Sequence, residues 1–275
     1  MKTALTIAGS DSGGGAGIQA DIKTFCAYGV YGMSVLTAVT AQNSTEVLSV
    51  ATLSPHIIRL QCQAVFEDFP VHAVKIGMTG NKEAMTAIVE ALEKYAPPFV
   101  VLDPVMVSKS GAALFDPQAK DVLLNALFPL ASLITPNIPE AEALTGLSLN
   151  SPEKREKAAY VLLESGAQAV LLKGGHISEN DLCQDLFINR QTKKVFSTPR
   201  IPTAHTHGTG CTLSSAIAAG LALGWPLPLS VSRAKAFVTE AIRKAPGLGK
   251  GAGPLDHHIS PFSLASREEQ DDGCF

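Results

Sequence analysis

Short, nearly continuous apolar runs alternate along this chain with longer segments of helical periodicity, and this alternation limits the fold more than any other feature. The run Phe99-Val100-Val101-Leu102 is typical, because a strand that is apolar at every position is buried on both faces. Such strands occur in parallel sheets that helices cover on both sides. The sequence predicts them at Thr3–Ala8, Ser34–Thr40, Ala73–Gly77, Phe99–Leu102, Ser132–Thr135 and Ala169–Lys173.

Helix signals fill the gaps between these strands. Ser54-Pro55 and Ser151-Pro152 each place a capping hydroxyl before a proline, which suits the first helical position. Helices are expected near residues 16–28, 56–69, 82–95, 118–127, 139–145, 153–165, 210–224 and 229–245. Residues 184–188 and 195–197 flank a polar turn and indicate an antiparallel pair of strands. The chain is therefore predicted to be an α/β protein with a mostly parallel central sheet.

Composition excludes several classes of protein. Hydrophobic residues make up 46% and the formal net charge is -3, so we expect neither disorder nor binding to nucleic acid or a membrane surface. No apolar run approaches the ~20 residues of a membrane span. The five cysteines form no CxxC pair, which argues against disulfides and favours the cytoplasm. We expect one domain over residues 1–253 and a mobile, polar tail at 254–275.

A glycine-rich run, Gly9-Ser10-Asp11-Ser12-Gly13-Gly14-Gly15-Ala16-Gly17, directly follows the first predicted strand. Ligands of open parallel sheets bind beyond the carboxyl ends of the strands, and glycines let a ligand approach the backbone closely. A dinucleotide-binding G-x-G-x-x-G pattern starting at Gly13 fails, because Ile18 occupies its last position. The pattern G-x-x-x-x-G-K-[ST] does not occur in the sequence. The run therefore predicts a ligand-binding loop of another kind.

A second glycine-rich turn, His205-Thr206-His207-Gly208-Thr209-Gly210-Cys211-Thr212, precedes a predicted helix of small residues. Gly208 and Gly210 leave the backbone N–H groups at the start of this helix uncovered, and a helix N-terminus attracts anions. Phosphate is the expected guest. The same field is expected to lower the pKa of the Cys211 thiol and so stabilise a thiolate. The alternative, a small buried cysteine without a chemical role, stays open.

Polar residues follow three further predicted strands, at positions where a buried charge is costly unless it is paired or faces a ligand. They are Asp103, Asn137, Glu140 and Lys173. The set fits Mg²⁺ held through carboxylates, with the lysine on phosphate oxygens. Taken alone, Glu140 fits equally well in the first turn of a helix, where it favours the helix dipole.

Gln42 ends the second predicted strand, within Thr40-Ala41-Gln42-Asn43. Its amide presents a donor and an acceptor in one plane, which matches the ring-nitrogen and amino edge of a heteroaromatic ligand. An ordinary loop amide is the alternative. Met78, after the third strand, offers an adaptable apolar wall to the same ligand.

Over most of residues 3–245 the sequence resembles the hydroxymethylpyrimidine/phosphomethylpyrimidine kinases of the ribokinase superfamily. The motifs that carry the resemblance occur in a consistent order: Ala8–Asp21, Thr40–Asn43, Lys75–Met78, Asp103–Met106, Thr135–Asn137, Leu172–His176 and His207–Cys211. The resemblance implies a three-layer α/β/α ribokinase-like fold and a homodimer. It also implies ATP-dependent phosphorylation of 4-amino-5-hydroxymethyl-2-methylpyrimidine, and then of its monophosphate to the diphosphate, in thiamine biosynthesis.

The resemblance further implies roles for individual residues. Gln42 would bind the edge of the pyrimidine. The residues near the substrate would be Gly9, Asp21, Met78 and Val105. Lys173 would contact the phosphates of ATP, and Asp103, Asn137 and Glu140 would organise Mg²⁺ and phosphate oxygens. The anion-binding loop beside the reacting hydroxyl would consist of Gly208, Thr209, Gly210 and Cys211, with Cys211 as the general base.

The sequence departs from the pattern at two positions. Sugar kinases of the superfamily usually carry Asp where Cys211 stands, and His205 occupies a position where Asn is expected. The small residues of Val107–Ala113 suggest a loop that closes over the site. The nearest alternative activity is a pyridoxal or pyridoxine kinase, since that ring carries a similar hydroxymethyl group. A non-catalytic binding module for a nucleotide or vitamin precursor is a second alternative.

Overall fold

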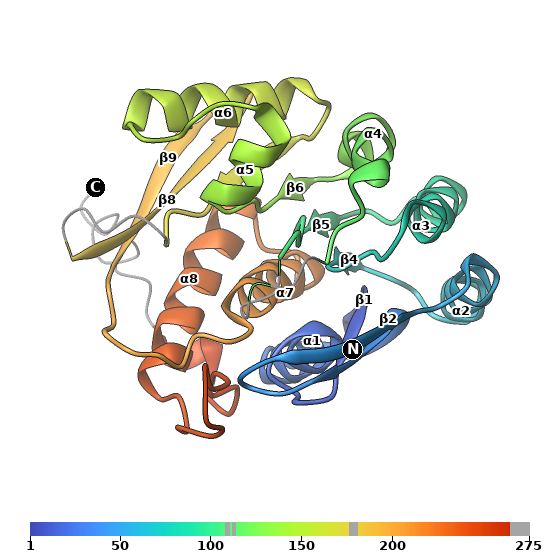
Figure 1. The fold of residues 1–275 in the computed structure, drawn as a ribbon, viewed down its shortest axis with the longest axis horizontal. Coiled ribbons are helices and arrows are strands. Elements are labelled where there is room, and N and C mark those ends of the chain that lie inside the picture. Colours follow the sequence, from blue (N-terminus) through green and yellow to red (C-terminus); the bar gives the residue numbers. More distant parts are fainter. Residues whose placement is uncertain (108–110, 112–113, 176–180, 265–275) are drawn as a thin grey trace.

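The computed structural model describes residues 1–107, 111, 114–175 and 181–264. Within them, nine strands form one sheet in the order β3-β2-β1-β4-β5-β6-β7-β8-β9 (Figure 1). The strands are β1 (Thr3–Asp11), β2 (Tyr31–Gln42), β3 (Val47–Thr52), β4 (Ala73–Ile76), β5 (Val100–Leu102), β6 (Leu133–Ile134), β7 (Ala169–Leu172), β8 (Leu182–Asn189) and β9 (Lys193–Pro199). The six strands from β2 to β7 in this order are parallel, and β3, β8 and β9 pair antiparallel at the two ends of the sheet.

Helices cover both faces of the sheet (Figure 1). One face carries α1 (Gly17–Ala27), α7 (Thr209–Ala222) and α8 (Leu227–Arg243). The other carries α2 (Pro55–Asp68), α3 (Lys82–Tyr95), α4 (Lys120–Val122), α5 (Ile138–Thr145) and α6 (Pro152–Glu164), with α4 inside an irregular helical stretch from Pro117 to Leu130. As predicted, Ser54 and Ser151 cap α2 and α6 through their side chains.

Successive residues of one strand reach different hydrophobic cores. In β1, Leu5 and Ile7 pack into the core beneath α2–α6, whereas Ala4 packs into the core beneath α1, α7 and α8. The same alternation recurs in β5 and β7. Burial on both faces explains why these strands are apolar at every position. The predicted three-layer α/β/α fold with a mostly parallel sheet is confirmed.

Among the described strands, β3 is the one that the sequence did not predict. It forms a hairpin with β2, and its residues are almost all exposed; Leu48, for example, is 67% exposed. A strand without a buried face leaves no period-two pattern in the sequence. No helix in the described ranges is long and apolar enough to cross a membrane.

The segment after residue 253 was assigned by the sequence to a mobile tail, but its first part is packed against the domain. Leu255 and Ile259 are buried in the core of α1, α7 and α8, and Pro254 forms an isolated bridge with His207. These apolar side chains anchor residues 254–264 despite their surroundings of glycine and proline. Residues 265–275 lie outside the described part of the chain.

The sheet order places a topological switch at β1. The chain passes from β1 to β2 on one side, and returns to place β4 on the other side of β1. Loops that leave a parallel sheet on opposite sides of such a point open a crevice at the carboxyl ends of the strands. Every loop that the sequence singled out for chemistry leaves the sheet at this edge or begins α7 beside it.

Candidate active site

A cavity of about 720 Å³ opens at the carboxyl ends of the parallel strands. Every residue that the sequence predicted for the site lines this cavity, except Asp21. The residues that the fold brings together are Gly9, Gln42, Met78, Asp103, Val105, Asn137, Glu140, Lys173, Gly208, Thr209, Gly210 and Cys211. The predicted closing loop at Val107–Ala113 cannot be compared with the structure, because residues 108–110 and 112–113 lie outside the described ranges.

Helix α7 begins at this cavity without a side-chain cap. Gly208 precedes the helix with φ of 82°, a left-handed conformation that favours glycine. In the part of the chain that the structure describes, the backbone N–H groups of Gly210 and Cys211 have no hydrogen-bond acceptor. A Cβ atom on Gly208 would overlap the carbonyl group of Gly15, so the two glycine-rich loops are in close contact. This turn offers free backbone donors to the cavity, as an anion site requires.

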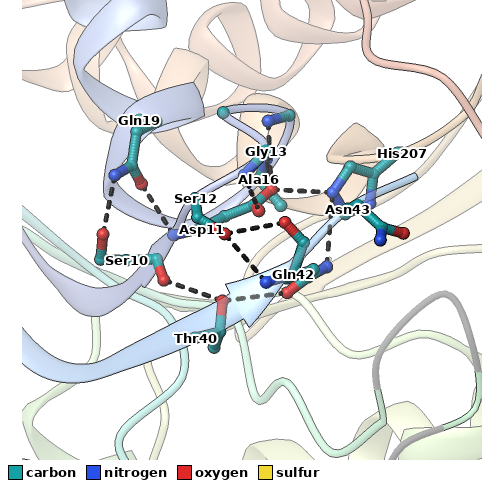
Figure 2. A network of polar contacts seen from close by, with 12 residues as sticks. Ser10, Asp11, Ser12, Gly13, Ala16, Gln19, Thr40, Gln42, Asn43 and His207 are labelled. Carbon is teal, nitrogen blue, oxygen red and sulfur yellow. Dashed lines mark hydrogen bonds and ion pairs between the residues drawn. The ribbon is translucent and has the colours of Figure 1, made fainter. Parts of the chain in front are cut away.

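The glycine-rich loop after β1 is built around its own carboxylate (Figure 2). Asp11 Oδ1 accepts a hydrogen bond from Gly13 N at 2.8 Å, and Oδ2 accepts from Gly15 N at 3.1 Å and Ala16 N at 2.8 Å. His207 Nε2 lies 2.9 Å from the same Oδ2. Burial alone would raise the pKa of Asp11, but these hydrogen bonds hold it below its usual value. The donors of this loop are therefore already used.

Gln42 lies between this loop and the cavity. Its amide nitrogen is 3.5 Å from His207 Nε2, and its amide oxygen is 3.3 Å from Thr40 Oγ1, as Figure 2 shows. Gly9 and Met78 form a wall nearby, and a Cβ atom on Gly9 would come within 3.1 Å of the Met78 sulfur. Gln42 thus presents a polar planar group to a cavity that Gly9 and Met78 also line.

An ion pair crosses the cavity floor near the start of α7. Lys173 Nζ lies 2.5 Å from Asp103 Oδ1, which also accepts a hydrogen bond from Thr135 Oγ1 at 2.9 Å. Burial alone would lower the pKa of Lys173, but Asp103 and then Glu140 raise it above its usual value. A Cβ atom on Gly210 would come within 3.1 Å of Asp103 and 3.4 Å of Lys173, so both charges lie against α7.

Glu140 serves the two roles that the sequence analysis weighed against each other. It forms a capping box with Asn137: Asn137 Oδ1 accepts from Glu140 N at 2.9 Å, and Glu140 Oε2 accepts from Asn137 N at 2.7 Å. Its side chain also lines the cavity. Burial raises the pKa of Glu140 to about 7; Lys173 opposes this shift and Asp103 adds to it. Helix capping therefore fixes a carboxyl group beside the ion pair.

Asp21 does not line the cavity, contrary to the contact with substrate that the resemblance implied. Its carboxylate is fully buried and accepts two hydrogen bonds from Lys75 Nζ, at 2.7 and 2.9 Å. Thr6 Oγ1 and Ser215 Oγ each donate to it at 2.6 Å. Lys75 stands between this carboxylate and the cavity, which it lines. Lys75 thus links the buried Asp21 carboxylate to the cavity.

Lys75 is a residue that sequence reasoning missed as a candidate for the site. Burial alone would lower the pKa of its ammonium group, but the Asp21 carboxylate raises it above the usual value. The signal was a lysine inside the apolar strand Ala73–Ile76, because a fully buried lysine requires a partner. The hydrogen bonds in the folded structure show that the partner is Asp21 of α1.

The structure corrects the expected thiolate at Cys211. Burial raises the pKa of the Cys211 thiol to about 11, and Asp21 and Asp103 add to this effect, while Lys75 opposes it. The helix N-terminus was expected to lower this pKa, but withdrawal from water and two carboxylates outweigh it. A pKa this far above neutral keeps Cys211 in its thiol form at pH 7.

A second buried ion pair was also missed by the sequence analysis. Lys235 of α8 lies 2.6 Å from Asp185 Oδ2 of β8, and Asp185 Oδ1 accepts from Gly174 N at 2.9 Å. Both side chains line the cavity, together with apolar groups of α7 and α8 such as Leu213 and Val238. The pair therefore fixes the loop that follows Lys173.

His205, noted for departing from the expected pattern, lies beside the loop that contains Gly253. It is partly buried, and in the described structure its Nδ1 has no hydrogen-bond partner. A Cβ atom on Gly253 would come within 2.5 Å of this Nδ1. His205 therefore packs against the Gly/Pro-rich segment rather than lining the cavity.

Comparison with known proteins agrees with this geometry. Residues 11–256 match the family model described as phosphomethylpyrimidine kinase. A hydroxymethylpyrimidine/phosphomethylpyrimidine kinase of Haemophilus influenzae is 47% identical over 260 residues, which are 94% of this chain and 97% of the relative. The thiamine biosynthesis bifunctional protein ThiED of Geobacter sulfurreducens is 50% identical over 263 residues, which are 96% of this chain but 54% of that longer protein.

Solved structures show the same similarity. A phosphomethylpyrimidine kinase from Clostridium difficile 630 is 48% identical, with a TM-score of 0.79 over 88% of this chain and 100% of that one. A Bacillus subtilis pyridoxal kinase, solved as an ADP complex, is 36% identical, with a TM-score of 0.87 over 96% of this chain and 100% of that one. The family match, the identities and the shared architecture lead to one conclusion: the chain belongs to the phosphomethylpyrimidine kinase family.

Proposed function

We propose that this protein transfers a phosphoryl group from ATP to 4-amino-5-hydroxymethyl-2-methylpyrimidine, and then to the monophosphate that results. One observation carries the proposal: a single cavity holds the Gln42 amide, suited to a ring edge, and the free N–H groups at the start of α7. The relatives named for this activity support it, since they match nearly the whole chain. The second phosphorylation would use the same anion-binding turn.

The charged groups beside α7 suit phosphoryl transfer. The migrating group spreads negative charge over its equatorial oxygens, so positioning and electrostatics dominate catalysis. The N–H groups of Gly210 and Cys211 and the ammonium group of Lys173 would meet this charge. Because Asp103 holds Lys173 in the ligand-free protein, the phosphates of ATP must compete with that carboxylate for the ammonium group.

The donors around Asp103 fit Mg²⁺ bound together with ATP. In the described ranges, no group of three or more His, Cys, Asp or Glu side chains could hold an ion by itself. Mg²⁺ commonly binds through one or two carboxylates, substrate phosphates and several waters. Asp103 and Glu140 line the cavity beside Asn137 and would supply those carboxylates. When bound, the ion would neutralise charge on the phosphate oxygens.

Cys211 would accept the proton of the substrate hydroxyl in the first phosphorylation. Its place at the start of α7 puts it beside the free N–H groups. The Lys75 ammonium group favours the thiolate and would stabilise it once the hydroxyl proton is taken. Asp21, held by Thr6 and Ser215, would keep Lys75 in place.

A product assay tests the proposed function. Purified protein with ATP and Mg²⁺ is offered the aminopyrimidine alcohol and pyridoxal, in separate reactions and in competition. We expect the pyrimidine monophosphate and then the diphosphate, with kcat/KM higher for the pyrimidine than for pyridoxal. Absence of both pyrimidine products from folded, ATP-binding protein would refute the proposal.

Pyridoxal phosphorylation is the second candidate, favoured by specific structural neighbours. The pyridoxal kinase of Staphylococcus aureus, solved with ADP and with pyridoxal, is 36% identical, and both structures match with a TM-score of 0.86. The same assay separates the two activities, and a strong preference for pyridoxal would reverse their order.

We further propose that the protein is a homodimer, joined through the hairpin of β2 and β3. Leu48 and Val50 of the edge strand β3 lie on the same face of this hairpin and are 67% and 40% exposed, so they leave apolar surface at the edge of the sheet. Light scattering should give twice the chain mass, and Leu48→Glu should give the monomer. Leu182→Glu, which changes an exposed leucine of β8, is the control. A monomeric wild type would contradict this proposal.

A further inference from the structure

The neighbours of Gln42 determine which end of its amide is oxygen. Amide oxygen and nitrogen occupy nearly equivalent positions, so their assignment follows from the hydrogens around them. As drawn in Figure 2, the amide nitrogen lies 3.5 Å from His207 Nε2 and the amide oxygen lies 3.3 Å from Thr40 Oγ1, and half a turn about the last side-chain bond exchanges the two atoms. Both neighbours are themselves engaged with other groups (Figure 2).

At the first end, His207 Nε2 must carry a hydrogen. Asp11 Oδ2, 2.9 Å away, is an acceptor that already receives two backbone N–H groups, so only a protonated Nε2 makes this contact favourable. Nε2 is a donor both in this neutral tautomer and in the imidazolium ion. The amide end that faces His207 is therefore favourable as the oxygen, which can share the Nε2 hydrogen with Asp11 Oδ2, and unfavourable as the NH₂ group, which would face another donor.

At the second end, Thr40 has already used its hydrogen. Its hydroxyl donates to the backbone carbonyl of Ser10 at 2.9 Å. The lone pairs that remain on Oγ1 can only accept, so the amide end that faces Thr40 is favourable as the NH₂ group. The two ends of Gln42 thus favour one and the same orientation.

We propose that Asp11 and His207 are a positioning pair that holds Gln42 with its oxygen toward His207 and its nitrogen toward Thr40, and that this orientation selects a ring with an amino group next to a ring nitrogen. The inference rests on the proposed function and deepens it. Asp11 and His207 are both nearly buried, with side chains 4% and 10% exposed. The pair is therefore shielded from water, which would otherwise weaken its control of the amide.

The orientation also sets which way the ring faces. Gln42 keeps one N–H and one oxygen lone pair for a ligand, and these match a ring nitrogen and an amino group side by side. The amino group then lies on the side of His207. In the proposed substrate, the hydroxymethyl-bearing carbon adjoins the amino-bearing carbon, so the hydroxymethyl group points to the same side. Gly208, directly after His207, begins the anion-binding turn there.

A pyridoxal ring cannot use this arrangement fully. Its nitrogen is flanked by a methyl-bearing carbon and a C–H group, so it offers no neighbouring amino donor. It can accept from the amide nitrogen of Gln42, but it leaves the amide oxygen unpaired. Loss of the positioning pair should therefore weaken binding of the aminopyrimidine more than binding of rings that lack the amino group.

A ligand pair isolates this effect. Calorimetry gives the Kd of 4-amino-5-hydroxymethyl-2-methylpyrimidine and of its analogue without the amino group. We expect wild type to prefer the amino compound, and His207→Leu to reduce that preference about 5- to 10-fold, the worth of one hydrogen bond. His207→Gln, whose amide can donate in place of Nε2–H, should restore most of it. KM for ATP should change little in either variant.

The control is His258→Leu, because the His258 side chain is 99% exposed. Equal weakening of both ligands by His207→Leu, or a His207→Gln variant no better than His207→Leu, would overturn the proposal.

Neutron diffraction of the protein without substrate determines the orientation of the Gln42 amide independently of any activity measurement. It should show a hydrogen on His207 Nε2 and the NH₂ group of Gln42 facing Thr40; the reverse orientation would also overturn the proposal. If wild type binds and phosphorylates neither pyrimidine, the proposed function fails, while the neutron result still decides what holds Gln42.

Discussion

The two glycine-rich loops of this protein touch each other, yet they treat negative charge in opposite ways. The loop after β1 directs its N–H groups at Asp11, a carboxylate of its own. The turn before α7 directs its N–H groups into the cavity, where no acceptor of the described residues meets them. Glycine content alone therefore does not identify a phosphate site. A glycine-rich loop can bind phosphate only if its backbone N–H groups are not already hydrogen-bonded to a side chain of the same loop.

The largest effect is expected at Cys211, in the open turn. Cys211→Ala should lower kcat of the first phosphorylation about 10²- to 10⁴-fold, the usual contribution of a general base. Because burial raises the pKa of this thiol to about 11, the wild-type kcat should rise with pH from 6 to 9, and the variant should lose this dependence. Steady-state kinetics across pH measure both. Cys26→Ala, at an exposed cysteine, is the control; an unchanged rate in Cys211→Ala would leave Cys211 only a packing role.

The next effect is expected at Gly208. A methyl group there would strain a φ of 82° and collide with Gly15, which displaces the N–H groups of the open turn. Gly208→Ala should lower kcat about 10²- to 10³-fold, as when an oxyanion donor is removed. Gly29→Ala is the matched control, because Gly29 also has positive φ, 67°, but no atom within 4 Å of the added carbon. If both variants keep the wild-type rate, the turn does not bind the migrating group.

In the filled loop, removal of the charge should affect stability first. Asp11→Asn places an NH₂ group among backbone donors and should lower the free energy of unfolding by about 2–4 kcal/mol. Asp68→Asn, at an exposed position, is the control. KM for ATP should stay near the wild-type value. A large rise in that KM would show that the first loop also binds phosphate, and would remove the contrast between the loops.

The acid dependence of the same variant sharpens this test. The hydrogen bonds hold the pKa of Asp11 below its usual value, so the unfolded chain takes up this proton at a higher pH than the folded protein does. The stability from Asp11 is therefore complete near pH 6 and is lost as the pH falls below about 4. Urea unfolding should show the gap between wild type and Asp11→Asn closing over that range.

The smallest effect is expected at Glu140, the carboxyl group beside the open turn. Burial raises its pKa to about 7, so the folded protein keeps a proton that the unfolded chain releases near pH 4.5, and stability falls as the pH rises from about 4.5 to about 7. Glu140→Gln should remove this decline, so that the wild-type protein loses up to about 3 kcal/mol of unfolding free energy between pH 5 and pH 8 that the variant keeps. Glu83→Gln, in the first turn of α3, is the control. A parallel pH dependence in wild type and variant would contradict the shift.

The fold was largely predictable because its strands are buried on both faces, and burial on both faces leaves continuous apolar runs. Strand β3 could not be predicted because both of its faces are exposed, so it leaves no apolar run and no alternating pattern in the sequence. Asp103 and Lys173 could be found at strand ends, where charge is unusual. Their meeting at 2.5 Å depends on the order of strands, which no local pattern contains.

The chemistry of single groups was harder to predict than their position. Lys75 and Asp21 are 54 residues apart in the sequence, and Lys235 and Asp185 are 50 apart, so neither pair has a local signal. The predicted direction of the Cys211 pKa shift was wrong. The sequence indicates that Cys211 lies at a helix N-terminus, but it does not show the surrounding carboxylates or the loss of contact with water, which raise this pKa. The sequence placed Asp11 in the glycine-rich loop, but it did not show that the Asp11 carboxylate accepts hydrogen bonds from the backbone of that same loop.

The contact between Gly15 and Gly208 also bears on how such a site can be redesigned. Neither residue has a side chain that could move aside. A larger residue at Gly208 would therefore collide with the backbone of the loop that contains Gly15. A chimaera that imports only one of them begins with a steric collision. Transplanting this chemistry into another parallel sheet therefore requires both segments, moved together as one matched unit.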